Sequence, residues 1–159
     1  MSIFVNTVDS IGDEALTNSI IDRSITEIRD NYATSIGDYA FCKCSELTTA
    51  DFPAATSIGE SAFRFCSALT TADFPVAKSI GSYAFNSCSK LTALILRSAT
   101  MATLSNTGAL SATPIKSGTG YIYVPAALVD SYKAASNWST YANQIRAIED
   151  YPEICGGER

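Results

Sequence analysis

The sequence contains no histidine, and this absence excludes several kinds of catalytic and metal site. Nucleophilic hydroxyl groups (serine and threonine) and thiols (cysteine) are present. No imidazole can act as their general base, so a catalytic triad is excluded. The five cysteines also lack a histidine that would complete a zinc site, and only Cys42 and Cys44 are closely spaced. We therefore expect neither triad catalysis nor a structural zinc.

Basic residues and long apolar runs are also scarce. Eleven Lys and Arg stand against 16 Asp and Glu, a net charge of -5, which argues against a nucleic-acid partner because phosphate contacts need clustered cations. No run of about 18 apolar residues is present, so no membrane insertion is expected. Residues 1–6 lack a basic region followed by an apolar stretch, and we expect no signal peptide in this chain. An export signal would have been removed or would lie in a longer parent.

What the sequence has instead is a tandem repeat. Residues 35–56 return as residues 57–78 with 15 of 22 positions identical, and the block begins a third time at Ser79. A fixed short period predicts a stacked array in which each repeat contacts its neighbours, that is, a solenoid. Arrays of this kind bind partners with a surface, so the repeat indicates binding and not catalysis in a pocket.

Within one repeat the residue pattern predicts two short extended pieces. Residues 49–53 read Thr-Ala-Asp-Phe-Pro, which is the alternation of a strand closed by a proline that has no N–H for a ladder. Residues 35–37 predict a second extended piece that ends in a turn. The Ala-Phe-x-x-Cys stretch that follows is typical of a single helical or 3₁₀ turn. The glycines expected to supply permissive φ at the turn are Gly37, Gly59 and Gly81.

The apolar positions recur from repeat to repeat and define the expected core. A single repeat has too little apolar surface to fold alone, so stability must come from stacking like residues on one another. Cysteines 22 residues apart fall on one such column, where free thiols act as small hydrophobes. Cys42 and Cys155 lie off the column, and either could be exposed. The expected core columns are Phe41, Phe63 and Phe85; Cys44, Cys66 and Cys88; and Leu47, Leu69 and Leu91.

The periodicity also divides the chain. Degenerate copies extend the array at both ends, so we expect about five rungs of period 22 in residues 10–125, after a lead-in at residues 1–9. From Pro125 the apolar residues recur at helical spacing, which predicts a helical C-terminal cap over residues 126–150 that covers the edge of the last rung. Residues 151–159 are expected to form a tail or the start of a linker.

The repeat motif Ile-Gly-x-x-Ala-Phe-x-x-Cys-x-x-Leu-x-x-Ala/Ile-x-Phe/Leu-Pro resembles the BspA-like leucine-rich repeats of bacterial surface proteins. Residues 121–139 are similar to the closing unit that often follows such arrays, and the likeness covers residues 10–150. Phe and Ala stand at strand positions where leucine-rich repeats usually have Leu. The resemblance implies a leucine-rich-repeat solenoid with short parallel strands and irregular or 3₁₀ turns. It also implies a secreted or surface-attached bacterial protein that mediates adhesion, with no shared catalytic residues.

The outward-facing strand positions are the candidate binding site. Parallel strands lie about 4.7–4.9 Å apart, so side chains at equivalent positions stack into columns. Asp51 and Asp73 should then be neighbours of like charge, which is destabilising unless Arg29, a cation or a ligand group relieves it. One column holds Glu27, Thr49, Thr71 and Ala93, and the other holds Arg29, Asp51, Asp73 and Ile95.

Other interpretations of these residues stay open. The aspartate pair is compatible with a solubilising role that discourages sheet aggregation. Two carboxylates and threonine hydroxyls fall short of the roughly six to eight oxygen ligands of calcium, and a flat strand face offers no cleft for a glycosidase carboxylate pair. Tyr121 and Tyr123 lie on one strand face and could stack against a sugar, although tyrosines beside a cap more often serve packing.

Taken together, the residues and the resemblance predict a non-enzymatic protein-interaction or adhesion module that binds through its exposed strand face. A carbohydrate-binding module and a structural spacer that displays another domain are the alternatives. We expect a monomer without a cofactor, and a protein partner such as a host or bacterial surface protein. The expected location is extracellular or at the cell surface.

Overall fold

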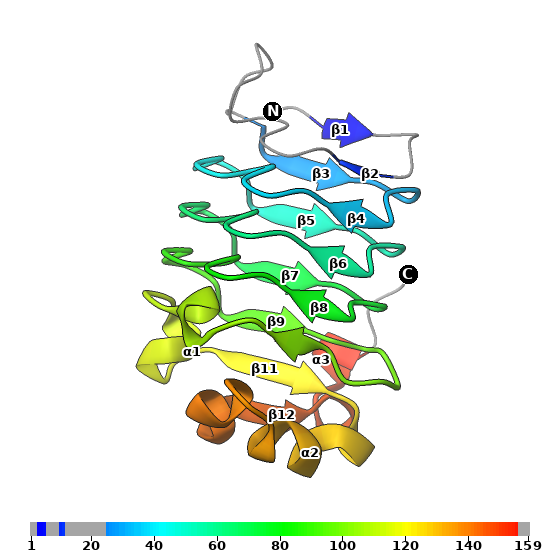
Figure 1. Ribbon diagram of the computed structural model, residues 1–159, viewed down its shortest axis with the longest axis vertical. Helices are drawn as coiled ribbons and strands as arrows, with labels where there is room; N and C mark the ends of the chain where they lie inside the picture. The colour runs from blue at the N-terminus through cyan, green and yellow to red at the C-terminus, as the bar shows by residue number, and fades with distance from the viewer. Residues whose placement is uncertain (1–2, 6–9, 12–24, 156–159) are drawn as a thin grey trace.

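The computed structural model describes residues 3–5, 10–11 and 25–155, and in these residues the chain winds into a stack of rungs (Figure 1). The rungs form two parallel sheets, called sheet A and sheet B here, on two sides of the stack. Sheet A has seven strands in the order β1 (Ile3–Val5), β3 (Glu27–Arg29), β5 (Thr49–Asp51), β7 (Thr71–Asp73), β9 (Ala93–Ile95), β11 (Tyr121–Val124) and β12 (Ile145–Ala147). Sheet B has five strands in the order β10 (Thr103–Leu104), β8 (Ser79–Ile80), β6 (Ser57–Ile58), β4 (Ser35–Ile36) and β2 (Ser10–Ile11).

The predicted solenoid with short parallel strands is confirmed. Each of the five sheet B strands is followed along the chain by one sheet A strand, from the pair β2 and β3 to the pair β10 and β11. Two further strands extend sheet A: β1 lies within the segment expected as a lead-in, and β12 within the segment expected as a helical cap. The remaining elements are η1 (Thr107–Leu110), α1 (Pro114–Ser117), η2 (Ala126–Leu128), α2 (Val129–Ala134), η3 (Trp138–Gln144), η4 (Ile148–Asp150) and α3 (Pro152–Cys155).

The register of both sheets places identical residues beside each other. In sheet A, Thr49 pairs with Thr71 and Asp51 with Asp73, and in sheet B, Ser57 pairs with Ser79. The sequence period therefore equals one turn of the solenoid. As a result, every column of the sequence repeat becomes a column of side chains in space.

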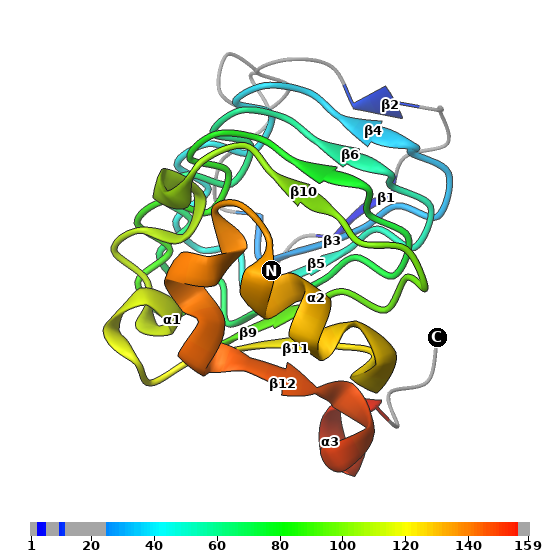
Figure 2. The same cartoon turned by 60° about the horizontal axis from the view of Figure 1, so that its bottom comes forward.

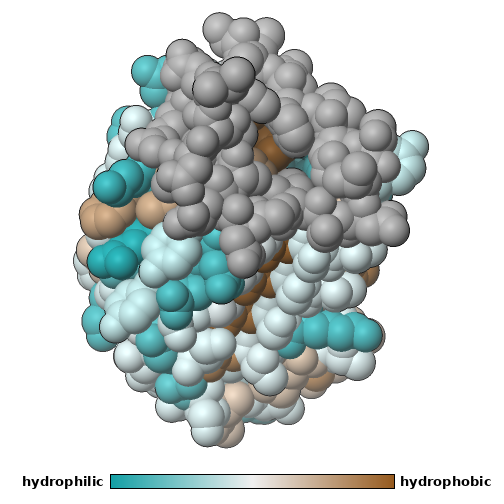
Figure 3. Space-filling view, turned by 45° about the horizontal axis from the view of Figure 1, so that its top comes forward, coloured by the Kyte–Doolittle hydropathy of each residue, from teal (hydrophilic) through white to brown (hydrophobic). Residues whose placement is uncertain are grey.

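The core between the sheets is a double ladder of phenylalanine rings. Phe63 stacks between Phe41 and Phe85 with ring centroids 5.3 and 5.4 Å apart, and a second ladder pairs Phe52 with Phe74 at 5.9 Å. Offset stacks at such distances add to the stabilisation from burial. The side chains of the expected core columns are all buried: Phe41, Phe63, Phe85, Cys44, Cys66, Cys88, Leu47, Leu69 and Leu91. On the side seen in Figure 3 the surface is mostly hydrophilic or intermediate, and hydrophobic residues form a narrow band.

The Ala-Phe-x-x-Cys stretch forms consecutive tight turns instead of a continuous helical turn. Tyr39 and Lys43 have φ of 58° and 66°, in the left-handed region, and the next two rungs repeat the pattern. The backbone N–H groups of Tyr39, Phe41 and Lys43 each donate to a carbonyl of the following rung at 2.8 Å. A helix would keep its hydrogen bonds within one rung. The left-handed residues thus allow the turns, as well as the strands, to bond rung to rung.

The repeat glycines allow close approach and do not supply the positive φ that the sequence predicts for Gly37, Gly59 and Gly81. Among the described glycines, positive φ occurs at Gly118. A Cβ on Gly59 would lie 2.6 Å from the backbone nitrogen of Asp38, and one on Gly81 would lie 2.6 Å from the carbonyl carbon of Gly59. Adjacent rungs are therefore too close at this corner for any side chain.

Residues 126–150 close the C-terminal end of the stack (Figure 2). The backbone N–H of Ala102 donates to Tyr132 Oη at 2.8 Å, and Trp138 Nε1 donates to the Ala102 carbonyl at 2.9 Å. Asn137 Nδ2 donates to the Leu104 carbonyl at 2.6 Å. Side chains of the cap thus bond the edge of β10, where another strand would otherwise pair.

Phe63→Ala tests the ladder. The change removes a ring that two neighbours on each side enclose, so we expect a loss of about 3–5 kcal/mol in the free energy of unfolding. Urea denaturation followed by circular dichroism measures it. Phe65→Ala is the matched control, because Phe65 is 41% exposed and its replacement should cost about 1 kcal/mol or less. Equal losses in the two variants would show that the Phe63 ring does not stack in the core.

Candidate functional site

The outer face of sheet A is the candidate site, and its N-terminal strands carry polar side chains. Glu27 and Arg29 are exposed on β3, Thr49 is exposed on β5, and Thr71 is partly exposed on β7. Between them Ile28, Ala50 and Ala72 point into the core. The two expected columns therefore exist on this face. The pairing Glu27–Thr49–Thr71 gives the first, and Arg29–Asp51–Asp73 gives the second.

Two arginines compensate the stacked aspartates. Arg29 Nε lies 3.4 Å from Asp51 Oδ2, and Arg97 Nε lies 3.2 Å from both carboxylate oxygens of Asp73. The aspartate side chains are only 19% and 13% exposed, so the expectation that they are displayed to solvent is wrong. They are covered because each lies under an arginine. The like-charge neighbours of one column thus become two ion pairs.

Arg97 was missed by sequence reasoning, although the repeat contains a signal for it. Arg97 stands 22 residues after Pro75 and 44 after Pro53, so a cation replaces the proline that closes the other strands. Its position is two residues beyond Ile95, on the same side of the strand as the aspartate column. Here a charged residue interrupts the regular proline column close to two aspartates of opposite charge. Such an interruption predicts an ion pair.

Farther along sheet A the same face becomes apolar and is covered. Ala93, Ile95, Tyr123 and Ile148 form a buried cluster separate from the main core, called the outer cluster here. Tyr121, Tyr151 and Ile154 pack against it. Tyr151 and α3, which belong to the segment expected as a tail or linker, therefore lie on this face. The candidate site has an open polar part on β3, β5 and β7 and a closed apolar part on β9 and β11.

Tyr121 and Tyr123 do not form the flat platform expected for a sugar. Their rings meet at 60° with centroids 6.5 Å apart, and the Arg146 guanidinium lies 3.3 Å from the Tyr121 ring centroid. Tyr123 is buried, and this burial raises the pKa of its phenol. Both rings are taken up by packing against Arg146 and Tyr151, as the cap interpretation of these tyrosines implies.

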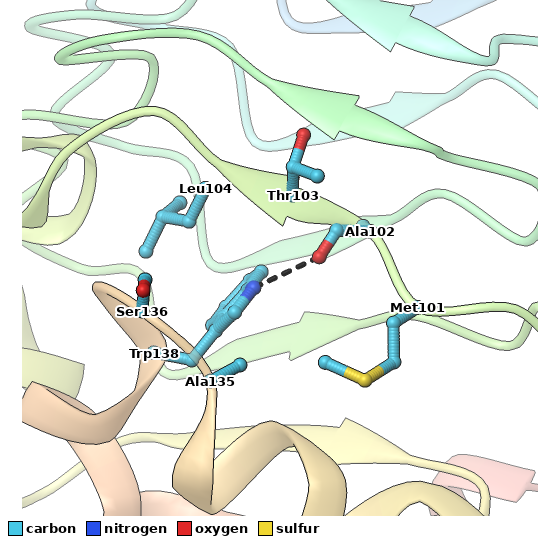
Figure 4. A pocket seen from close by; sticks show the side chains of 7 residues that line it. All are labelled: Met101, Ala102, Thr103, Leu104, Ala135, Ser136 and Trp138. Atoms are coloured by element: carbon cyan, nitrogen blue, oxygen red, sulfur yellow. Dashed lines mark hydrogen bonds between the residues drawn. The ribbon is translucent and has the colours of Figure 1, made fainter.

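A small cavity of about 200 Å³ lies between β10 and the cap (Figure 4). Its lining is mainly apolar, and the indole N–H of Trp138 is already bonded to the Ala102 carbonyl. No residue of its lining titrates near neutral pH, so the cavity offers no acid–base pair. The lining residues are Met101, Ala102, Thr103, Leu104, Ala135, Ser136 and Trp138.

The thiols of the cysteine column are all buried. Cys66 Sγ donates to the Phe41 carbonyl at 3.1 Å and Cys88 Sγ to the Phe63 carbonyl at 3.0 Å. Burial raises the pKa of Cys66 well above its usual value and that of Cys88 to about 12. Cys42, which could have been exposed, is buried as well. The side chain of Cys155 lies outside the described residues.

The described residues, 3–5, 10–11 and 25–155, contain neither a cluster of metal ligands nor a membrane-spanning helix. In this part of the chain, no group of three or more histidine, cysteine or acidic side chains is placed to ligate a metal ion. No helix in the same part combines the length and the apolar character that crossing a membrane requires.

Comparison with known proteins gives a family and a fold. The sequence model of the family described as "BspA type Leucine rich repeat region" matches residues 9–119 in six copies. The crystal structure of a T. pallidum leucine-rich repeat protein is similar with a TM-score of 0.63 and 21% identity, over 77% of this chain and 57% of that one. A leucine-rich repeat protein from Bacteroides ovatus matches with a TM-score of 0.59 and 18% identity, over 77% of this chain and 30% of that one. The chain thus spans well under two thirds of either, and no curated protein matches it.

Thiol titration tests the cysteine column. In the native protein Cys44, Cys66 and Cys88 should not react with a thiol reagent at pH 8, because the thiolate is the reactive form and burial disfavours it. Adding denaturant should release them. Since the pKa of Cys88 rises from 9.0 to about 12 on folding, stability should also fall as the pH increases from 9 towards 12. Rapid labelling of the column in the native state would contradict the stacked arrangement.

Asp73→Asn and Asp51→Asn form a matched pair of variants. The Arg97 side chain is 19% exposed, so losing its charged partner should cost about 1–2 kcal/mol, less than a fully buried pair. The Arg29 side chain is 67% exposed, and the loss there should stay below about 1 kcal/mol. Urea denaturation at low and high salt measures both. An Asp73→Asn variant as stable as the wild type would show that the Arg97 pair contributes nothing.

Proposed function

Because the chain belongs to the BspA-type leucine-rich repeat family, we propose that it is a non-enzymatic protein-interaction module that binds through the exposed strand face of its solenoid. The supporting observation is the open polar part of sheet A, where Glu27, Arg29 and Thr49 point outward from strands held in fixed register. Such a surface is rigid before binding, so little conformational entropy is lost when a partner docks.

The chemistry of the open part favours a protein partner. It presents an acid, a base and hydroxyl groups within adjacent rungs, a mixture that suits hydrogen bonds and ion pairs with a polypeptide surface. The Tyr121 and Tyr123 rings, which a sugar would need for stacking, are engaged in packing with each other, Arg146 and Tyr151. We place the module in a secreted or surface-attached bacterial protein, where it mediates adhesion to a host or bacterial surface protein.

We also propose that the module acts as a monomer. The edge of β10 is bonded by Tyr132, Trp138 and Asn137, so this end of sheet B offers no ladder to a second copy. Binding would then take place on the side of the solenoid, and the C-terminal end would serve stability.

A pair of charge-matched double variants tests the proposed face. Glu27→Lys with Thr49→Arg changes the open part, while Asp130→Lys with Ser131→Arg makes the same charge change at exposed residues of α2 in the cap. Binding to a panel of purified extracellular-matrix and bacterial surface proteins is measured by surface plasmon resonance. A partner of the wild type should lose at least ~10-fold in affinity to the first variant and little to the second.

Two outcomes would overturn the proposal. Equal losses in both double variants would mean that net charge, and not this face, determines binding. Selective binding on a glycan array without any protein partner would make the chain a carbohydrate-binding module.

A further inference from the structure

The C-terminal segment Tyr151–Cys155 lies on the outer face of sheet A, beside the strands and not at the end of the stack (Figure 2). The cluster that it packs against is apolar where the preceding rungs are polar: Ala93 and Ile95 stand in the columns of Thr71 and Asp73. These residues and Tyr123 are buried in the outer cluster, although they belong to the outward side of their strands. The segment therefore removes the apolar part of the face from contact with water.

Three contacts hold the segment on this surface. The Tyr151 ring meets the Tyr123 ring edge-on at 5.3 Å, and the Ile154 side chain packs against the outer cluster. The Ile154 carbonyl accepts a hydrogen bond of 3.0 Å from Arg97 Nη2. The surface of sheet A thus binds three groups of the segment. They are an aromatic ring, an aliphatic side chain three residues later, and the carbonyl oxygen of that residue.

Arg97 and Arg146 add a charge preference to this surface. Arg97 also pairs with Asp73, and the Arg146 guanidinium lies 5.0 Å from the Tyr151 ring centroid. The segment itself carries Glu153. Besides burial, which raises the pKa of the Tyr123 phenol most, Arg146 lowers this pKa and Glu153 raises it, so both lie close enough to Tyr123 to act on it. The complementarity is that of a peptide and its binding site.

The segment has little structure of its own to keep it in place. α3 has four residues, far fewer than the roughly 12–15 that an isolated helix needs for marginal stability. Tyr151 and Ile154 also remain partly exposed. The segment is thus held by the surface beneath it, and a competitor that makes the same contacts can replace it.

We propose that the outer cluster with Arg97 and Arg146 is a peptide-binding site that the chain's own Tyr151–Ile154 occupies and that a partner enters by displacing it. The partner presents an acidic polypeptide segment with an aromatic and an aliphatic side chain three residues apart. This inference deepens the proposed function, since the site continues the same strand face. The open part then makes the first contact, and displacement extends the interface over β9 and β11.

A peptide added in trans tests the site without a known partner. The probe is a fluorescent peptide with the sequence of residues 149–159 and serine at position 155. The full-length Ile154→Asp variant should release its own segment, since a carboxylate cannot pack against the outer cluster. An intramolecular competitor acts at an effective concentration in the millimolar range, so the variant should bind the probe at least ~10-fold more tightly than the wild type.

Controls separate the site from general effects of charge and folding. Val76→Asp introduces the same charge at an exposed valine and should bind the probe as weakly as the wild type. Probes with Tyr151→Ala or Ile154→Asp should lose at least ~10-fold in affinity for the Ile154→Asp protein. Ile154→Ser serves as a second release variant without added charge, and cooperative melting shows that each variant is folded.

The peptide site and the proposed function can each fail independently of the other. A folded Ile154→Asp or Ile154→Ser protein that binds the probe no better than the wild type, or equal binding of all probes, overturns the peptide site. The two charge-matched double variants are tested for binding to protein partners and not to the probe, so failure of the proposed function would appear in a separate measurement. A partner found there should bind Ile154→Asp more tightly than Val76→Asp.

Discussion

Hydrogen bonding from each rung to the next, with equivalent residues 22 apart in the regular rungs, is the constraint on which the rest of the structure depends. The strands bond in this way in both sheets, and so do the turns, where Tyr39 donates to Glu60 and Phe41 to Ala62. The corner at Gly59 and Gly81 has no space for a side chain, which keeps the offset the same there. The longer rungs keep this bonding, because their extra residues lie outside the paired strands: Ala93 of β9 pairs with Tyr121 of β11, 28 residues later.

This register stacks identical side chains on one another in adjacent rungs. The stacking stabilises some columns and destabilises others. Phenylalanine gains from it, since Phe63 packs between two equivalent rings. The cysteines gain too, because each thiol of the inner rungs reaches a carbonyl one rung earlier. Aspartate loses, and the chain compensates with Arg29 at one end of the Asp51–Asp73 pair and Arg97 at the other. Both arginines occupy positions where the repeat is irregular, so charge compensation comes from the departures from the consensus.

The same distinction explains how much the sequence could predict. The solenoid, its strand positions and its parallel pairing follow from periodicity, because a repeat of this length has few other ways to bury its apolar residues. The left-handed turns could not be predicted, since Tyr39, Lys43 and Phe65 are not residues that favour positive φ. Rung-to-rung bonding imposes that conformation against local preference. The Arg97 ion pair and the packing of Tyr151 and α3 depend on single residues outside the repeat, for which periodicity carries no information.

The C-terminal residues perform two separable tasks, and their positions show the difference. Residues of the cap bond the edge of β10 and fill the end of the core, as Trp138 and Tyr132 do. Tyr151 lies near β12, the last strand of sheet A, because the Arg146 guanidinium is 5.0 Å from its ring centroid. Tyr151 and Ile154 also pack against the outer cluster, which includes Ala93 and Ile95 of β9, two strands away from that end. There they cover the strand face beside the open polar rungs, and Arg97 bonds both the segment and Asp73. Whatever moves the segment therefore also changes the environment of an ion pair at the boundary of the open part, which couples the two parts of the face through one guanidinium group.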